Sequence, residues 1–197
     1  MNRIFPMAQA RGPALLAVVF AISAVTGCKP NADREEAFRP IAVGEPVPEF
    51  TVRTLKGDSA RIAAGEPITL LHVWATWCGP CQMEFPEIEA IQQEFGPRGL
   101  RIVAVSVDEG DDDPVRAFAR GKGATFTIGR DAEGVVRRLY QSIGVPESYL
   151  ISADGRLLVR QFGALPDGAA ALRAAIEKAL ASPAPASRSG EPRRASM

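Results

Sequence analysis

The chain has few of the residues that mark a disulfide scaffold, a metal centre or a nucleic-acid binder. Its 197 residues include three cysteines and one histidine, and three cysteines are far too few for a disulfide scaffold. Lys plus Arg and Asp plus Glu number 23 each, so no basic excess indicates nucleic-acid binding. The length allows one domain with extensions, at about 150 residues per domain.

The one long apolar run is too short to span a bilayer comfortably. It covers residues 13–25 and carries no charge, whereas a transmembrane helix needs roughly 20 apolar residues. Arg3 and Arg11 precede it, and small residues end it before Cys28, as in an export signal. This ending resembles the lipobox of bacterial lipoproteins, which implies a signal peptide at residues 1–27 and acylation of Cys28. The alternative is an ordinary secretory signal, with Cys28 as a stray thiol.

Two further segments lack the composition of a packed core. Residues 28–44 are largely polar and contain prolines, which predicts an extended tether. Residues 182–197 are rich in Pro, Ser, Ala and Arg, which predicts a disordered tail. We therefore expect a single folded domain at residues 45–181.

Strand and helix patterns alternate within this domain. Residues 50–55 and 59–62 flank a Lys-Gly-Asp turn and predict a β-hairpin. Apolar runs at residues 68–75 and 100–107 are typical of strands buried on both faces. Helices are predicted at residues 80–95, 113–119, 135–142 and 167–180, and short strands at residues 125–128, 149–152 and 157–162. The alternation predicts an α/β fold with helices on both faces of a sheet.

The chemistry concentrates in Trp77-Cys78-Gly79-Pro80-Cys81, where a strand ends and a helix begins. Unpaired amides and the helix dipole at this position lower the pKa of the Cys78 thiol. A thiolate attacks disulfides, and Cys81, one helical turn away, can displace the resulting mixed disulfide. A zinc site would need two more ligands, and only His72 and the distant Cys28 remain. We therefore expect redox chemistry, with neither a metal nor another cofactor.

These residues also carry a family resemblance. The Trp-Ala-Thr-Trp-Cys-Gly-Pro-Cys run, Glu84-Phe85-Pro86 and Gly144-Val145-Pro146 are similar to the TlpA/ResA-like thiol-disulfide oxidoreductases of the thioredoxin superfamily. The resemblance covers about residues 44–180. It implies a thioredoxin-like fold: a central mixed sheet flanked by helices, with an N-terminal β-hairpin and an inserted helix-strand unit between residues 107 and 130.

The resemblance also implies roles for individual residues. Cys78 becomes the exposed nucleophile, Cys81 the resolving thiol and Pro146 a cis-proline beside the pair. A cis bond would expose the Val145 backbone to an incoming extended chain; a trans proline opening an edge strand is the alternative. Substrate contacts are expected from four residues: Trp77, Gly79, Pro80 and Val145.

Two ionisable residues near the dithiol allow more than one interpretation. Glu84 lies one turn after Cys81; if buried it exchanges a proton with the resolving sulfur, as the resemblance implies, and otherwise it is a solvated first-turn acid. His72 departs from the family, which usually has Asp or Asn there. A hydrogen-bonded core histidine is favoured over a proton relay. Trp74 is expected in the core. The acidic run at residues 109–113 is predicted to be a solvated loop with a helix cap at Asp113, without metal.

Together these features predict an extracytoplasmic, membrane-anchored thiol-disulfide oxidoreductase that reduces disulfides in exported proteins. Gly-Pro between the cysteines is the dipeptide of the reductant thioredoxin, and a reductant outside the cytoplasm needs a transmembrane electron donor. Family analogy suggests apocytochrome c or copper-site thiols as substrates. The alternatives are a peroxiredoxin-like peroxidase and a copper-binding chaperone of related fold.

Overall fold

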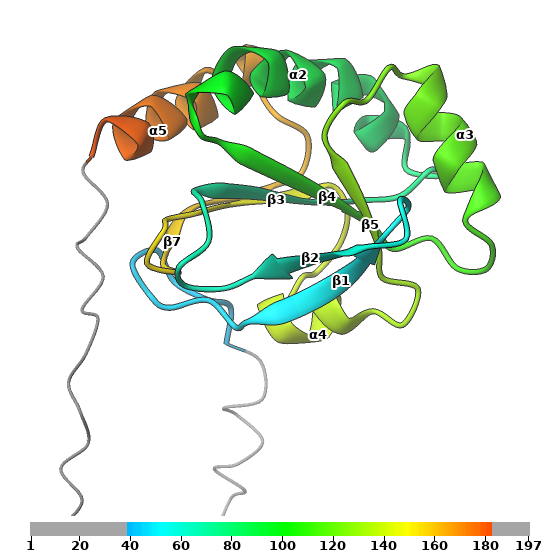
Figure 1. The fold of residues 1–197 in the computed structure, drawn as a ribbon, viewed down its shortest axis with the longest axis horizontal. Coiled ribbons are helices and arrows are strands. Elements are labelled where there is room, and N and C mark those ends of the chain that lie inside the picture. Colours follow the sequence, from blue (N-terminus) through cyan, green and yellow to red (C-terminus); the bar gives the residue numbers. More distant parts are fainter. Residues whose placement is uncertain (1–38, 183–197) are drawn as a thin grey trace, which may run out of the picture. The chain divides into compact units, whose positions relative to one another are not determined.

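A seven-stranded mixed sheet organises residues 39–182, the part of the chain that the computed structural model describes (Figure 1). The strands are β1 (Phe50–Thr54), β2 (Ser59–Ile62), β3 (Thr69–Trp74), β4 (Arg101–Ser106), β5 (Thr127–Arg130), β6 (Glu147–Ile151) and β7 (Leu157–Phe162). Their order across the sheet is β2-β1-β5-β4-β3-β6-β7. The central strands β3, β4 and β5 are parallel, and the other neighbours pair antiparallel. The predicted mixed sheet and N-terminal hairpin are confirmed.

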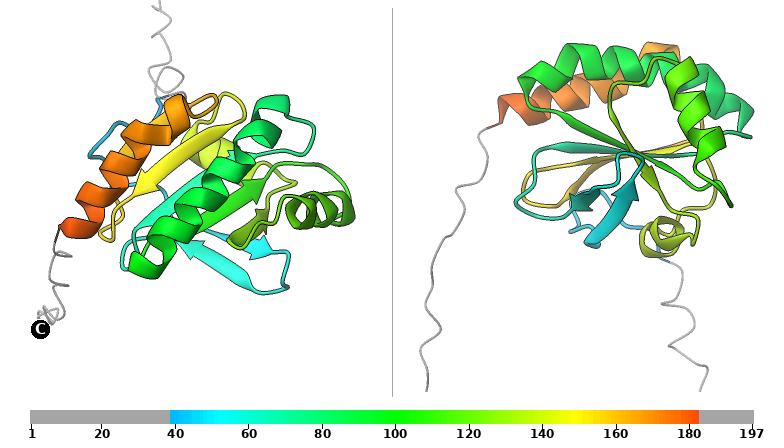
Figure 2. Two further views of the ribbon diagram at one scale, coloured as in Figure 1. Left: turned by 90° about the horizontal axis from the view of Figure 1, so that it is seen from above. Right: turned by 45° about the vertical axis from the view of Figure 1, so that its right-hand side comes forward.

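Helices cover both faces of the sheet (Figures 1 and 2). One face carries α2 (Gly79–Phe95), α3 (Asp113–Gly121) and α5 (Ala170–Ala181), and the other carries the short α4 (Val135–Tyr140). Short 3-10 turns, η1 (Gly96–Arg98) and η2 (Asp167–Ala169), adjoin α2 and α5. The pair α3 and β5 is the predicted inserted helix-strand unit, which is also confirmed.

The central strand β3 is buried on both sides, which explains its nearly continuous apolar sequence. Leu70 and Trp74 pack under α2, where the Trp74 ring lies 4.6 Å from that of Phe85. Leu71 and Val73 belong to the second core cluster, on the α4 side. Because successive side chains alternate along a strand, His72 faces α2 together with Leu70 and Trp74.

The parallel arrangement of β3 and β4 places their carboxyl ends at one edge of the sheet. Trp74 is opposite Ser106 in this pair, and the Val107 N–H continues the ladder by donating to the Trp74 carbonyl at 2.9 Å. The turn that leads to Cys78 therefore lies beside the residues that follow β4, although the two segments are about 30 positions apart in sequence.

β5 and β6 each begin two residues away from the predicted start, because polar residues have partners outside the usual pattern. β5 begins at Thr127, since the Thr125 N–H and hydroxyl bond the Glu89 carboxylate of α2 at 2.9 and 2.8 Å. β6 begins at Glu147, a buried carboxylate that accepts a hydrogen bond from Arg160 at 2.6 Å. Periodicity alone misses strand residues of this kind.

The last predicted helix is divided in two. A 3-10 turn precedes α5, and Gly168 and Ala169 have positive φ angles of 64° and 58°. These left-handed conformations interrupt the helical backbone, so the α-helix begins at Ala170 rather than at residue 167.

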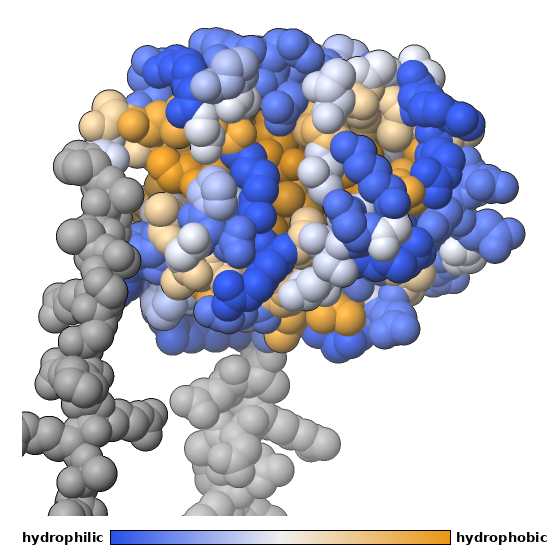
Figure 3. Space-filling view, in the orientation of Figure 1, coloured by the Kyte–Doolittle hydropathy of each residue, from blue (hydrophilic) through white to orange (hydrophobic). Residues whose placement is uncertain are grey.

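Polar residues cover much of the outer surface, and hydrophobic residues are visible between the upper helices and the sheet (Figure 3). No helix within residues 39–182 is long and apolar enough to cross a membrane. The chain packs against β7 from Gly44, whose N–H donates to the Leu157 carbonyl at 2.7 Å. The predicted signal peptide, Cys28 and all but the first residue of the predicted tail lie outside the described residues.

Candidate active site

The two cysteines lie at the start of α2 and are joined by a disulfide. Cys78 is the N-cap residue, and its sulfur accepts the N–H of Cys81 at 3.2 Å. Pro80 occupies the first turn, where its missing N–H removes no helical bond. Cys78 is 5% exposed and Cys81 is completely buried. Of these two cysteines, only Cys78 keeps any exposed surface.

A hollow in the surface lies beside Trp77, the residue that precedes Cys78. Trp77 is 68% exposed, and the Val145-Pro146 peptide bond is cis, as the resemblance implied. Both Trp77 and Val145 line a hollow of about 530 Å³, together with Asp108, Glu109, Arg137, Val107 and Gly144. Trp74, by contrast, is fully buried, as predicted. A second hollow, of about 500 Å³, opens at the other end of β3 beside Ile68 and Ala179. Neither Cys78 nor Cys81 lines either hollow.

Glu84 is buried behind the dithiol, on the second turn of α2. It is 6% exposed, and its Oε2 accepts the Leu165 N–H, from the loop between β7 and α5, at 2.9 Å. Burial raises the pKa of Glu84 to about 7, although the hydrogen bond from Leu165 acts in the opposite direction. Glu84 is therefore buried and not a solvated first-turn acid, and its proton exchange with the resolving sulfur stays a prediction.

His72 is also fully buried, on β3 beneath α2. Its Nδ1 lies 2.9 Å from the Ser148 hydroxyl on the neighbouring strand β6. Burial lowers the pKa of His72 to about 3, so the imidazole is neutral at physiological pH. The favoured interpretation as a hydrogen-bonded core histidine is confirmed for Nδ1. Nε2 instead approaches Glu84 Oε1 at 3.5 Å.

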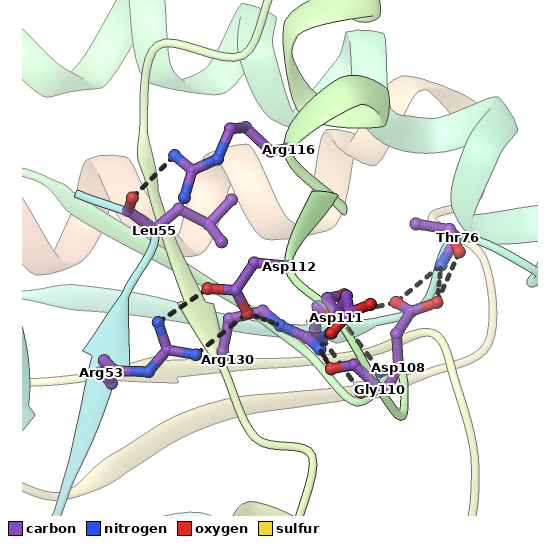
Figure 4. Close-up of polar contacts among 10 residues, drawn as sticks. Arg53, Leu55, Thr76, Asp108, Gly110, Asp111, Asp112, Arg116 and Arg130 are labelled. Atoms are coloured by element: carbon purple, nitrogen blue, oxygen red, sulfur yellow. Dashed lines mark hydrogen bonds and ion pairs between the residues drawn. The ribbon is translucent and has the colours of Figure 1, made fainter. Parts of the chain in front are cut away.

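Asp108 is a site residue that the sequence predictions missed. It is buried, and its carboxylate accepts the Thr76 N–H at 3.0 Å, the Thr76 hydroxyl and the Ser106 hydroxyl (Figure 4). On the other side, the Gln82 side chain donates to the Thr76 carbonyl at 2.7 Å. Hydrogen bonds to the N–H and to the carbonyl of Thr76 therefore hold the turn between Trp74 and Cys78 in place. Its place directly after the predicted buried strand at residues 100–107 is the sequence feature that could have identified Asp108 as a site residue.

An ion-pair network extends from Asp108 to the N-terminal hairpin (Figure 4). Arg130 of β5 donates to the Ser106 hydroxyl at 2.8 Å and to the Asp108 carbonyl at 3.0 Å. Its Nε lies 2.9 Å from Asp112 Oδ1, and Arg53 of β1 binds the same carboxylate with both terminal nitrogens. Hydrogen bonds from Arg53 and then from Arg130 hold the pKa of Asp112 well below its usual range.

This network corrects the prediction for the acidic run. Glu109, Asp111 and Asp113 are exposed, but Asp112 is not a simply solvated residue. The N-cap of α3 is Asp112, not Asp113, and its side chain makes no capping bond because the two arginines occupy it. Within residues 39–182, no group of three or more His, Cys, Asp or Glu side chains is arranged to hold a metal ion.

Sequence and structure comparisons agree with this geometry. Residues 43–160 match the AhpC/TSA family. The chain belongs to that family. Among its relatives, the thioredoxin-like protein YneN of Bacillus subtilis is 35% identical over 58% of this chain and 68% of its own length. The thiol-disulfide oxidoreductase ResA of Oceanobacillus iheyensis is 32% identical over 72% of this chain and 71% of its own length.

A solved structure extends the likeness to the three-dimensional fold. A Chlorobium tepidum protein assigned as the thiol:disulfide interchange protein DsbE is 32% identical, with a TM-score of 0.65 over 71% of this chain and 99% of its own. The predicted ResA-like, thioredoxin-superfamily membership is therefore confirmed. The protein is a thiol-disulfide oxidoreductase of the AhpC/TSA family, with the Cys78–Cys81 pair as its disulfide.

Proposed function

We propose that the protein is an extracytoplasmic, membrane-anchored reductase of disulfides in exported proteins. The observation that supports this most directly is the asymmetry of the dithiol. Cys78 caps α2 directly after the exposed Trp77 and keeps 5% of its surface exposed, whereas Cys81 is completely buried. This arrangement suits one attacking sulfur and one resolving sulfur.

The proposed reaction has two exchange steps, starting from the reduced dithiol. The Cys78 thiolate attacks a substrate disulfide, forms a mixed disulfide and releases one substrate thiolate. Cys81 then loses its proton to the Glu84 carboxylate and attacks Cys78 Sγ. This forms the Cys78–Cys81 disulfide and releases the second substrate sulfur as a thiolate. The Cys78–Cys81 disulfide of the structure corresponds to the oxidised state in which this proposed cycle ends.

The dipeptide between the cysteines favours reduction over oxidation. Gly79-Pro80 is the thioredoxin dipeptide, and thioredoxin has a potential of about −270 mV, against about −120 mV for the oxidant DsbA. Because the compartments outside the cytoplasm are oxidising, the dithiol must be re-reduced by a transmembrane electron donor. The predicted signal peptide and lipid anchor at Cys28 support this location, since a reductant held at the membrane stays close to such a donor.

Exposed apolar side chains support a polypeptide substrate. Trp77, Met83, Ile143 and Phe162 are large hydrophobic residues that remain exposed. Trp77 precedes Cys78, and Met83 lies on the helix that begins after Cys78. The Phe162 ring lies about 3.5 Å from the position that a Cβ atom on Gly144 would occupy. Exposed apolar residues of this kind bind unfolded or extended chains. Apocytochrome c and copper-site thiols are the candidate substrates, by family analogy.

Trapping of the mixed disulfide tests this function. Cys81→Ser blocks the second exchange step, so the variant should accumulate disulfide-linked partners through Cys78 when it is expressed in its native envelope. Cys78→Ser is the matched control and should trap nothing. Mass spectrometry of the partners then separates cytochrome precursors, copper proteins and general exported proteins. Equal background in both variants would contradict the exchange mechanism.

Two alternatives are tested in the same preparation. A peroxidase would consume hydroperoxide without added thioredoxin, but Thr76 stands one residue too near Cys78 for the Thr-x-x-Cys turn of peroxiredoxins. A copper chaperone would bind copper tightly and stoichiometrically when reduced, but no histidine follows Cys81 to complete such a site. We expect neither activity.

A further inference from the structure

A histidine and a carboxylic acid face each other in the core behind the dithiol. His72 lies in the middle of β3 and Glu84 on the second turn of α2. His72 Nε2 and Glu84 Oε1 are 3.5 Å apart, and both side chains are buried. This distance is at the outer limit of a hydrogen bond, so the two atoms approach each other without a fully formed bond.

Each side chain is held by its opposite polar atom. His72 Nδ1 lies 2.9 Å from Ser148 Oγ, and Glu84 Oε2 accepts the Leu165 N–H at 2.9 Å. Within residues 39–182, neither Nε2 nor Oε1 has a hydrogen-bond partner. Buried polar atoms without partners are uncommon in folded proteins and require an explanation. Here the two unpaired atoms are aimed at each other.

The charge states of the two groups are complementary. A neutral imidazole with its proton on Nδ1 donates to Ser148 and leaves a lone pair on Nε2, and a protonated carboxyl can donate to that lone pair. On the β4 side, the residue paired with His72 is the uncharged Ala104. The ion pair of Glu147 and Arg160 lies on the opposite face of β6, since Glu147 alternates with Ser148.

We propose that His72 is a positioning residue for the proton of Glu84. Its Nε2 accepts the carboxyl O–H when the dithiol is oxidised, and in the tautomer that makes this possible the Nδ1–H donates to the Ser148 hydroxyl. The inference rests on the proposed function, in which Cys81 S–H transfers its proton to the Glu84 carboxylate as the Cys78–Cys81 bond forms and the substrate thiolate leaves. The transferred proton is then held between Glu84 and His72 in the disulfide state.

Infrared titration of the disulfide form tests this arrangement without substrate. The carbonyl band of protonated Glu84 is assigned by its loss in Glu84→Gln. His72→Asn keeps a polar group near Ser148 but has no atom at the position of Nε2, so the pKa of Glu84 should fall by about one pH unit. His72→Gln places an amide oxygen near that position and should restore most of the wild-type titration.

Two further variants supply the controls. Ser148→Ala removes the hydroxyl that pairs with His72 Nδ1, so His72 can adopt either neutral tautomer. This variant should lower the pKa of Glu84 by a smaller amount than His72→Asn does. Leu71→Val alters the opposite face of β3 and should leave the pKa of Glu84 unchanged. In the exchange reaction, the acid limb of the pH-rate profile should move with the infrared titration, which a purely structural role of His72 would not produce.

The outcomes separate this inference from the proposed function. Glu84 titrating as in the wild type in His72→Asn, or equally shifted in the Asn and Gln variants, would overturn the role of His72. If His72→Asn does not fold, equal titrations of Glu84 in Ser148→Ala and Leu71→Val would overturn it instead. A wild-type protein that performs no disulfide exchange would overturn the proposed function, while the infrared result would still decide the role of His72.

Discussion

Replacing Glu84 by Gln should stabilise the oxidised protein at alkaline pH. The pKa of Glu84 is raised from 4.5 to about 7 because burial disfavours the carboxylate. Between these values the folded protein holds a proton that the unfolded chain releases. The free energy of unfolding therefore falls as the pH rises through this window. Glu84→Gln keeps the shape of the side chain and removes the charge.

The size of the effect follows from the shift. A rise of about 2.5 in pKa, at about 1.4 kcal/mol for each pH unit, corresponds to about 3 kcal/mol. The loss of unfolding free energy that Glu84 causes in the wild type is almost absent at pH 4 and almost complete at pH 8.5. The advantage of Glu84→Gln over the wild type should therefore grow by about 3 kcal/mol between these two conditions. Folded His72 is largely neutral between these two pH values, and the titration of His72 in the unfolded chain is the same in both proteins, so its contribution cancels in the comparison.

Denaturant unfolding of the disulfide form at both pH values measures this difference. The same variant should slow the release of trapped substrate from Cys78 and flatten the pH dependence of exchange between about pH 6 and 9, because the proton acceptor for Cys81 is gone. A stability difference that is equal at pH 4 and pH 8.5 would show that Glu84 titrates normally and would refute the reasoning from burial.

Two other predictions concern the surroundings of Cys78. Asp108→Ala removes the acceptor of the Thr76 N–H and hydroxyl, so it should lower the free energy of unfolding by about 2 kcal/mol and slow attack by Cys78 on a small disulfide several-fold. Asp112→Asn leaves those bonds intact and should exchange at the wild-type rate, so equal slowing in both variants would contradict a positioning role for Asp108. Trp77→Ala should change stability by less than about 0.5 kcal/mol but raise KM several-fold for a polypeptide disulfide and not for a small one. Equal losses on both substrates would argue against a docking role.

Local sequence patterns were sufficient to predict the elements and the redox centre. The apolar runs of β3 and β4, the hairpin signals around Gly57 and the Cys-x-x-Cys spacing act over a few residues, and each has a direct conformational consequence. The disulfide between Cys78 and Cys81 needs only one turn of helix. The family motif added the cis peptide bond before Pro146, which no local pattern reveals.

The environment of each ionisable residue was decided only by the tertiary structure. Glu84 can be solvated or buried on the same helix, and in the fold it is buried and accepts the N–H of Leu165, 81 positions later. His72 meets Ser148 across 76 positions, and Thr76 meets Asp108 across 32. Such contacts depend on strand order and on how loops return to the sheet, since neither helical nor strand periodicity specifies the partner of a side chain. The sequence alone therefore identified the reacting sulfurs, whereas the packing of distant segments determined the groups that control their protons.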